Sequence, residues 1–269
     1  MGLPSKGFEK KTKQIMGVAS TILLTAAKPL LSRGAAVVWE NRNHINLLRK
    51  TKFGKYKNMS IRFSMSGLFK IQIPGTNKYL LVFNRRIENQ LQPVGGAYKR
   101  YGDDSLFNNW GYKPDSSRNG LDVDEKSSSD LRFSVEGRYA SEVLNWFESR
   151  REREENPKRE FNEELLETGI LDSKTFSHFD FKHIRRFSKT LSWSDYFSCY
   201  EILTYDIFEM IPDEAQKLSL IELANQELDI TKGYAVVSCD DIEQLRLMAG
   251  GKQIARIGQH AKLLINQSF

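Results

Sequence analysis

The sequence predicts an α/β domain preceded by a helical N-terminal segment, and three features of its patterning support this. From Ser60 onward, apolar and polar residues alternate as in strands with one buried face. Later stretches instead repeat apolar residues every three or four positions, as amphipathic helices do. Residues 1–57 differ in composition, with a basic stretch before an uncharged run from 15 to 27. We therefore divide the chain into a segment 1–57 and a domain 58–269, in which helices flank mixed strands in an α/β/α sandwich.

The composition is that of a globular protein with a moderate excess of positive charge. The 269 residues are 40% hydrophobic, enough for a sizeable core. The net charge of +6 suits a polyanionic ligand, although it also favours solubility. Cys199 and Cys239 lack a metal-ligand spacing and no cleavable signal peptide is evident, so we expect reduced thiols in a cytoplasmic protein.

The N-terminal segment allows two interpretations. A transmembrane helix needs about 20 apolar residues, and a span from 15 to 39 would enclose Lys28 and Arg33. One interpretation is helices that pack on the domain or support self-association with another subunit. The other is association of 15–39 with the inner membrane, where the preceding basic residues would lie at anionic headgroups.

The predicted strands and helices follow in order. We expect strands over 61–65, 68–73, 79–83, 90–94, 131–135, 176–187, 196–208 and 234–237. Polar residues dominate 100–130, which we interpret as an inserted loop. Helices are expected over 140–148, 212–229, 238–247 and 259–265. The helix over 212–229 should bury Leu218, Ile221, Leu223 and Leu228.

A short acidic helix is the most informative element. Positions three, four and seven apart share a helix face, so one carboxylate stripe is expected from Glu160, Glu163, Glu164 and Glu167. Phe161, Leu165 and Leu166 would face the core, while Asn156-Pro157 and Gly169 bound the helix. The stripe is either a solvated face or a site for a hard cation, Mg²⁺ or Mn²⁺.

The run Arg159-Glu160-Phe161-Asn162-Glu163-Glu164 resembles the heart of the Nudix box, and Gln92-Pro93-Val94-Gly95-Gly96 resembles the diglycine strand end that precedes such boxes. The resemblance implies a Nudix-like sandwich, in which Glu163 and Glu164 would be catalytic and all four stripe glutamates would hold metal. The box departs from the pattern because Leu165 to Thr168 separate the paired glutamates from Gly169, which makes the helix about one turn longer.

Further phrases resemble a divergent member of that superfamily, the SMODS-associated Nudix domain of bacterial cyclic-oligonucleotide anti-phage systems. They include Ile61 to Ser66, Asn89 to Lys99, Trp146 to Ser149, Trp193 to Leu203 and His260 to Lys262. The resemblance implies a nucleotide or cyclic-oligonucleotide ligand and a functional link to a nucleotidyltransferase.

Cationic and aromatic residues supply candidates for nucleotide binding. We select Arg62, Arg85, Arg86, Gly95, Gly96, Tyr98, Lys99, Arg185 and Trp193, with Arg100, Arg186, Trp110 and Tyr112 as further candidates. The alternatives are a solvated basic face and core aromatics, and His183 and His260 are more simply structural.

Four functions fit the sequence. The first is a nucleotide-sensing effector or accessory protein of an anti-phage system, with the N-terminal segment as output element. The second is a Mg²⁺-dependent pyrophosphohydrolase acting on a nucleoside diphosphate derivative. The others are a nucleic-acid-binding module, which no recognition motif supports, and a structural interaction protein. The first two require the stripe glutamates on one helix, with Gly95 and Gly96 close by.

Overall fold

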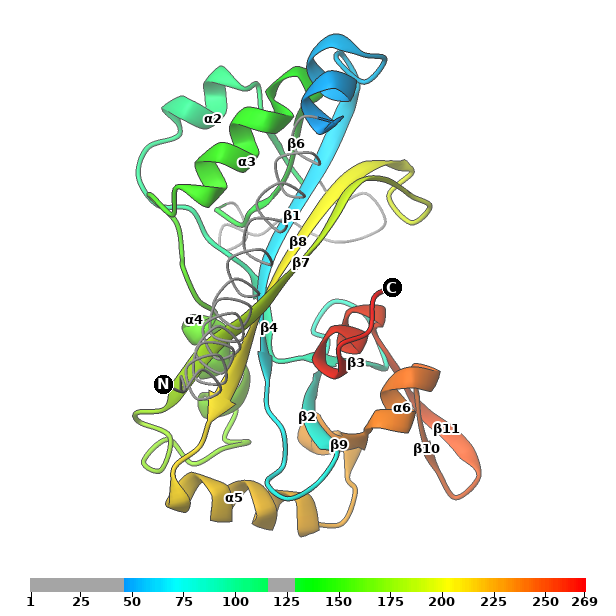
Figure 1. Cartoon of the computed structure of the whole chain (residues 1–269). Helices are drawn as coiled ribbons and strands as arrows, with labels where there is room; N and C mark the ends of the chain where they lie inside the picture. The colour runs from blue at the N-terminus through cyan, green and yellow to red at the C-terminus, as the bar shows by residue number, and fades with distance from the viewer. Residues whose placement is uncertain (1–45, 116–128) are drawn as a thin grey trace, which may run out of the picture.

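The strands form two mixed sheets, shown in the computed structural model, which describes residues 46–115 and 129–269 (Figure 1). The large sheet has the order β5-β6-β1-β8-β7, and β4 pairs with β1. Its strands are β1 (Ser60–Lys70), β4 (Gly95–Ala97), β5 (Lys113–Pro114), β6 (Arg132–Glu136), β7 (Asp180–Ser194) and β8 (Cys199–Ile211). The small sheet has the order β10-β11-β3-β2-β9, comprising β2 (Lys78–Phe83), β3 (Gln90–Pro93), β9 (Tyr234–Ser238), β10 (Arg246–Ala249) and β11 (Lys252–Ile257). The predicted α/β class with mixed strand directions is confirmed.

Strand β1 is the centre of the large sheet and is buried on both faces. It runs parallel to β8 and antiparallel to β6 and β4. Ile61, Phe63 and Phe69 on one face belong to the main core, whereas Arg62 and Ser64 on the other face line a cavity. The predicted alternation is therefore real, but its polar half faces a cavity within the protein.

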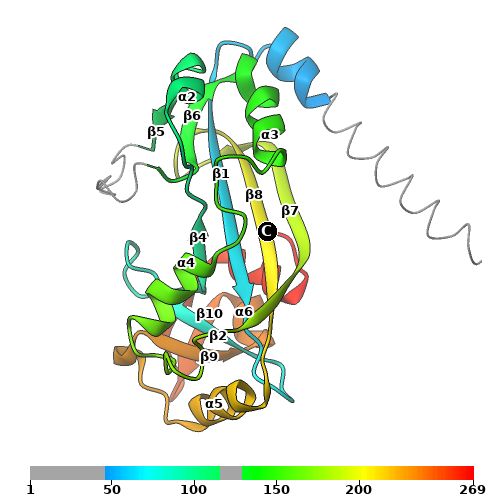
Figure 2. The ribbon, with the colours of Figure 1, turned by 90° about the vertical axis from the view of Figure 1, so that its left-hand side faces the viewer.

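Helices cover the apolar face of the large sheet. They are α3 (Ala140–Glu148) and the box helix, which consists of α4 (Lys158–Phe161) and a π-helical turn, η4 (Asn162–Leu166). Figure 2 looks onto this side, with α3 and α4 in front of the strands. Phe161 packs edge-on against Phe69 at 5.5 Å between ring centroids, which fixes the box helix to β1.

The small sheet and the C-terminal elements lie against the opposite face. Leu68 of β1 and Ile207 of β8 pack there with Leu91 of β3. The 3-10 helix η6 (Gln259–Ile265) adds Leu263 and Leu264 to this second core, and α6 (Cys239–Gln244) adds Ile242. The large sheet is thus the middle layer.

The remaining helices and turns connect these layers. They are α2 (Ser105–Asn109), α5 (Glu214–Asn225) and the 3-10 turns η3 (Gly137–Tyr139) and η5 (Ile230–Lys232). Helix α2 lies within the predicted inserted loop, whose described part packs on the core through Phe107 and Trp110.

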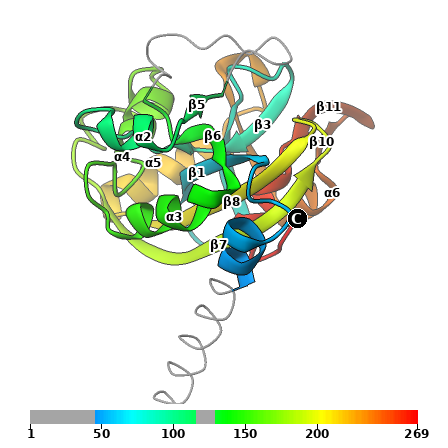
Figure 3. The ribbon, with the colours of Figure 1, turned by 90° about the horizontal axis from the view of Figure 1, so that it is seen from above.

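Residues 46–57 pack against the domain. The π-helical turn η1 (Arg49–Phe53) lies at one end of the large sheet, beside α3 (Figure 3). Leu47 and Thr51 are buried, and Tyr56 meets Tyr200 of β8 edge-on at 4.8 Å. The predicted helices and the membrane interpretation of 15–39 fall on residues outside the described part. Within the described residues, no helix is long and apolar enough to cross a membrane.

Several predicted elements need correction. The two strands predicted over 61–65 and 68–73 form one continuous strand, β1, which ends at Lys70. The helix predicted to reach Leu247 ends at Gln244, because Leu245 turns left-handed and a hairpin follows through Gly250 and Gly251. Helix α5 buries Leu220 rather than Leu218, which is 64% exposed, and Ile221 and Leu228 are exposed too. Strand β7 begins at Asp180, since Phe176 lies in a turn that inserts its ring into the core.

Candidate functional site

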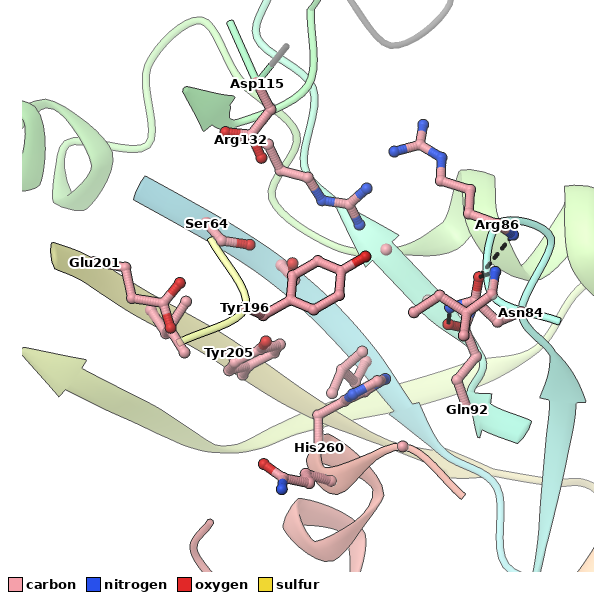
Figure 4. A pocket seen from close by; sticks show the side chains of 18 of the residues that line it. Ser64, Asn84, Arg86, Gln92, Asp115, Arg132, Tyr196, Glu201, Tyr205 and His260 are labelled. Carbon is pink, nitrogen blue, oxygen red and sulfur yellow. Dashed lines mark hydrogen bonds between the residues drawn. The ribbon is translucent and has the colours of Figure 1, made fainter. Parts of the chain in front are cut away.

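A cavity of about 430 Å³ lies between the polar face of the large sheet, the small sheet and η6 (Figure 4). Strand register builds its floor, because directly paired residues share a face of a sheet. Ser64 of β1 pairs with Arg132 of β6 and with Leu203 of β8, and Ser66 pairs with Tyr205 of β8. The cavity therefore has a floor supplied by three neighbouring strands.

One end of the cavity is cationic. Within residues 46–115 and 129–269, Arg132 forms an ion pair with Asp130 at 3.9 Å, which is beyond hydrogen-bond distance. Burial lowers the pKa of Arg132, and the charges of Arg86 and Arg62 add to this effect, while the charge of Asp130 opposes it. The Arg86 guanidinium makes no hydrogen bond or ion pair with another described residue. An anion placed between Arg86 and Arg132 would relieve their repulsion.

Among the described residues that line the cavity, a single carboxyl group, Asp130, lies at this end beside the two arginines. Burial raises the pKa of Asp130, although the charges of Arg132, Lys99 and Arg86 oppose that rise. Because one acid faces the two guanidinium groups of Arg86 and Arg132, this end of the cavity keeps a net positive charge.

Arg62 also lines the cavity, but its charge is paired. Its guanidinium donates to the Asp115 carboxylate at 2.6 Å and to Glu201 at 3.0 Å, and it lies 3.8 Å from the Phe197 ring centroid. Buried charges need partners of this kind. The three contacts leave Arg62 largely neutralised, unlike Arg86 and Arg132.

The other end of the cavity is aromatic. The rings of Tyr205 and His260 are nearly parallel, at 7°, with centroids 6.2 Å apart. Burial lowers the pKa of His260 to about 4, helped by the charge of Arg132, so its ring is neutral near pH 7. Tyr196, at the tip of the β7–β8 hairpin and 54% exposed, also lines the cavity. Neutral aromatic faces suit the stacking of a planar base.

Amide side chains hold the loop that carries Arg86. The Asn84 side-chain oxygen accepts hydrogen bonds from the backbone N–H groups of Arg86 at 2.7 Å and Ile87 at 2.8 Å. The Asn84 amide nitrogen donates to the Gln92 side chain at 2.6 Å. Asn84 thereby places the Arg86 backbone at the cavity rim (Figure 4).

The diglycine lies directly on the box helix, as predicted. The Gly95 N–H donates to Glu164 Oε2 at 2.9 Å, and a Cβ added at Gly96 would overlap the Glu160 carboxylate. The prediction that Gly95 and Gly96 lie close to the box glutamates is confirmed. The helix itself differs from the prediction, since its second half is a π turn and Glu167 forms its C-cap.

The box glutamates are engaged by protein groups. Arg159 donates to Glu154 at 2.8 Å, Glu160 at 2.9 Å and Glu163 at 3.2 Å. Burial alone would lower the pKa of Arg159, but its hydrogen bond to Glu154 and the charges of Glu160 and Glu154 raise it. The arginine thus balances a cluster of carboxylates.

Glu164 has a different environment. Burial raises the pKa of Glu164 to about 8, against the Gly95 hydrogen bond, which lowers it. Its carboxyl group is therefore largely protonated at neutral pH. Glu160 and Glu163 thus accept hydrogen bonds from Arg159, and Glu164 accepts one from the Gly95 backbone N–H.

The other predicted residues lie at separate places. Gly95, Gly96, Arg62 and Arg86 line the cavity. Arg85 donates to the Glu163 carbonyl, Arg185 to the Leu263 carbonyl, and Tyr98 is buried with its hydroxyl on Asp206. The Lys99 N–H donates to Glu154, and Trp193 is 52% exposed on β7. Among the further candidates, Arg100 pairs with Asp104, Arg186 pairs with Asp206, and Trp110 and Tyr112 pack in the main core.

Several cavity residues were missed by the sequence prediction. Arg132, Tyr196 and Tyr205 fall within predicted strands with no face assigned to them, and His260 is predicted to be structural. The usable signal was the alternation itself, because the polar positions of β1 mark the face that its neighbours share.

Mixed sheets, a diglycine strand end and an Arg-Glu helix packed on it are the features of a Nudix-type domain. The family model for the SMODS-associated NUDIX domain matches residues 60–265, and the chain belongs to this family. No curated protein and no solved structure matches the chain.

Nudix domains generally use a divalent metal such as Mg²⁺, and the described residues do not fit one as they are arranged. Among residues 46–115 and 129–269, no group of three or more His, Cys, Asp or Glu side chains has a geometry that could hold a metal ion. Arg159 donates to one oxygen of Glu160 and to one oxygen of Glu163, Glu164 accepts hydrogen bonds from Gly95 and Gln92, and Glu167 is exposed.

Proposed function

We propose that this domain is the nucleotide-sensing part of an effector or accessory protein in a bacterial anti-phage system, and that it binds a cyclic oligonucleotide or related nucleotide in the cavity. The observation that carries the proposal is the pair of poorly neutralised arginines, Arg86 and Arg132, facing neutral aromatic rings. Guanidinium groups bind phosphate oxygens, and aromatic rings stack on bases. The family supports the setting in a defence system.

The rest of the system follows from this role. A cytoplasmic nucleotidyltransferase would supply the ligand. The N-terminal segment 1–57 would carry the output, by self-association or at the inner membrane. Ligand can shift such an output only if it favours one of two arrangements of the protein.

The binding proposal is tested by mass spectrometry of small molecules that co-purify with the full chain, followed by calorimetric titration with cyclic di- and trinucleotides. Arg132→Gln should weaken binding at least tenfold, because a charge-assisted phosphate contact is lost. Arg151→Gln, an exposed arginine outside the cavity, is the control. A panel in which no nucleotide binds the wild-type chain would refute the proposal.

The output proposal is tested by sedimentation of the full chain and of a chain beginning at residue 46. The second start keeps Leu47 and Thr51, which are buried in the domain. Both chains should bind the nucleotide, and the longer one alone should change its association state or membrane partitioning. If neither changes, the N-terminal segment has no output role.

Hydrolysis is the second candidate. The observation in its favour is that the cavity reaches Gly95 and Gly96, whose neighbours are Glu164 and Glu160. Turnover of nucleoside diphosphate derivatives would require Mg²⁺ or Mn²⁺ and should fall by orders of magnitude in Glu163→Gln and Glu164→Gln. Inactivity over the whole panel, with and without metal, would exclude this candidate for those substrates.

A further inference from the structure

The cavity has two chemically different ends, and their separation defines a ligand. The arginine end consists of Arg86 and Arg132, and the aromatic end of Tyr205 and His260. Arg132 and Tyr205 project from the same sheet face, on strands that flank β1, and their β1 partners Ser64 and Ser66 are two residues apart. Residues two apart on a strand are separated by about 6.6 Å, and strands on either side of a common neighbour by about 9.6 Å. The backbones of Arg132 and Tyr205 are therefore about 12 Å apart, a distance that one nucleotide and the two side chains together can span.

The volume sets an upper limit on what enters. Protein sites for small ligands span about 300–1,000 Å³, and this cavity, at about 430 Å³, lies near the low end. It has room for one nucleotide unit with its phosphate, while the remaining units of a larger ligand would stay outside the mouth.

The position of the His260 ring depends on the absence of a side chain at Gly258. A Cβ added at Gly258 would lie 2.8 Å from His260 Cε1 and 3.1 Å from the Gln90 side-chain nitrogen. The Gly258 N–H donates to the Leu91 carbonyl at 2.8 Å, which ties this turn to β3. Glycine at 258 therefore lets the imidazole lie close to the backbone and parallel to Tyr205.

We infer that the recognition unit is a single nucleotide, with its base stacked on the platform of Tyr205 and His260 and its phosphate between Arg86 and Arg132. This inference rests on the proposed function and specifies which part of the ligand the domain reads. A cyclic oligonucleotide would bind by inserting one of its units, and a free nucleoside monophosphate would compete with it.

Two variants separate the two ends. His260→Ala should weaken the binding of adenosine and AMP by about tenfold and leave the affinity for inorganic pyrophosphate unchanged. Arg132→Gln should weaken the binding of AMP and pyrophosphate by tenfold or more and leave the affinity for adenosine unchanged. Gly258→Ala should reproduce the effect of His260→Ala through displacement of the ring, and Arg86→Gln should reproduce that of Arg132→Gln.

The controls are His178→Ala and Arg151→Gln, which alter exposed residues outside the cavity. Thermal unfolding of each variant shows whether it has folded, and Arg86→Gln, on a surface loop, tests the phosphate end if Arg132→Gln unfolds.

The outcomes distinguish the inference from the function beneath it. Competition between the four nucleoside monophosphates and a bound cyclic dinucleotide supports the inference. Cyclic oligonucleotides that bind while no monophosphate binds or competes would overturn the single-unit inference and leave the sensing proposal standing. If His260→Ala lost the same affinity for adenosine, AMP and pyrophosphate, the assignment of the base to the platform of Tyr205 and His260 would be wrong. If neither cyclic oligonucleotides nor monophosphates bind, the proposed function itself fails.

Discussion

The box helix and the cavity lie on either side of the diglycine, and they use charge in opposite ways. In the box, Arg159 contacts three carboxylates, and Glu164, whose pKa is raised by burial to about 8, accepts hydrogen bonds from the Gly95 N–H and the Gln92 amide. In the cavity, Arg86 and Arg132 face each other with one desolvated acid nearby. Removing one member of an internally paired charge cluster destabilises a fold because it leaves a buried charge without a partner, whereas charges without protein partners are available to a ligand. On this comparison we propose a structural role for the box and ligand binding for the cavity.

The largest effect is expected on removal of the central box arginine. Arg159→Ala would leave Glu154, Glu160 and Glu163 clustered without a cation, at a cost of about 3–5 kcal/mol in the free energy of unfolding. Urea denaturation measures this loss. Arg159→Lys keeps the charge and should lose less, and a loss below 1 kcal/mol in Arg159→Ala would show that the box is not structural.

The same variant sharpens the comparison with a metal-binding box. Without Arg159 the cluster is open to a divalent cation, and Mg²⁺ should raise the melting temperature of Arg159→Ala more than that of the wild type. If Mg²⁺ stabilises the wild-type chain as strongly, the box already binds metal.

Glycine 95 should be nearly as sensitive. Its φ of +133° is a conformation that side chains rarely adopt, and an added Cβ would overlap the Gly67 carbonyl oxygen. We expect Gly95→Ala to lower stability by about 3 kcal/mol or more. Gly111→Ala is the control, because Gly111 also has a positive φ but has open space for a Cβ. A similar loss of stability in both variants would mean that backbone strain alone explains the effect and that the overlap with the Gly67 carbonyl contributes nothing.

A structural feature could be predicted from the sequence where residues close together in the chain determine it. The box helix, its start near Asn156 and its end before Gly169 follow from short-range patterns. Its contact with the diglycine, 69 residues away in the sequence, follows from the family resemblance. The π turn follows from neither. The missed β10–β11 hairpin had a local signal, since Gly250-Gly251 forms its two-residue turn.

The cavity has no comparable local pattern. Arg86, Arg132, Tyr196 and His260 come from a loop, a strand, a hairpin tip and a 3-10 helix. Only the register of β6, β1 and β8 brings Arg132 and Tyr205 to one face. Single-sequence reasoning cannot supply this register, and so it favoured arginines such as Arg62, which the fold neutralises.

Glu164 predicts how stability depends on pH. Its pKa rises from 4.5 to about 8 on folding, so the folded state binds more protons between these values and stability falls as pH rises through them. The fall is on the order of a few kcal/mol. Urea denaturation at pH 5 and at pH 8.5 should show it, and Glu164→Gln should remove most of the difference. The lowered pKa of His260 makes an opposite contribution over the lower part of this range, so the test is the difference between the two chains. An equal pH dependence in wild type and Glu164→Gln would contradict the protonated state of Glu164.

The central claim is that nucleotide binds at the cavity arginines and does not use the box carboxylates. Calorimetric titration of the same nucleotide into wild type, Arg132→Gln and Glu163→Gln tests it most directly. We predict that Arg132→Gln weakens binding at least tenfold, while Glu163→Gln binds within twofold of wild type. The opposite pattern, with affinity lost in Glu163→Gln and kept in Arg132→Gln, would place the ligand on the box and contradict the claim.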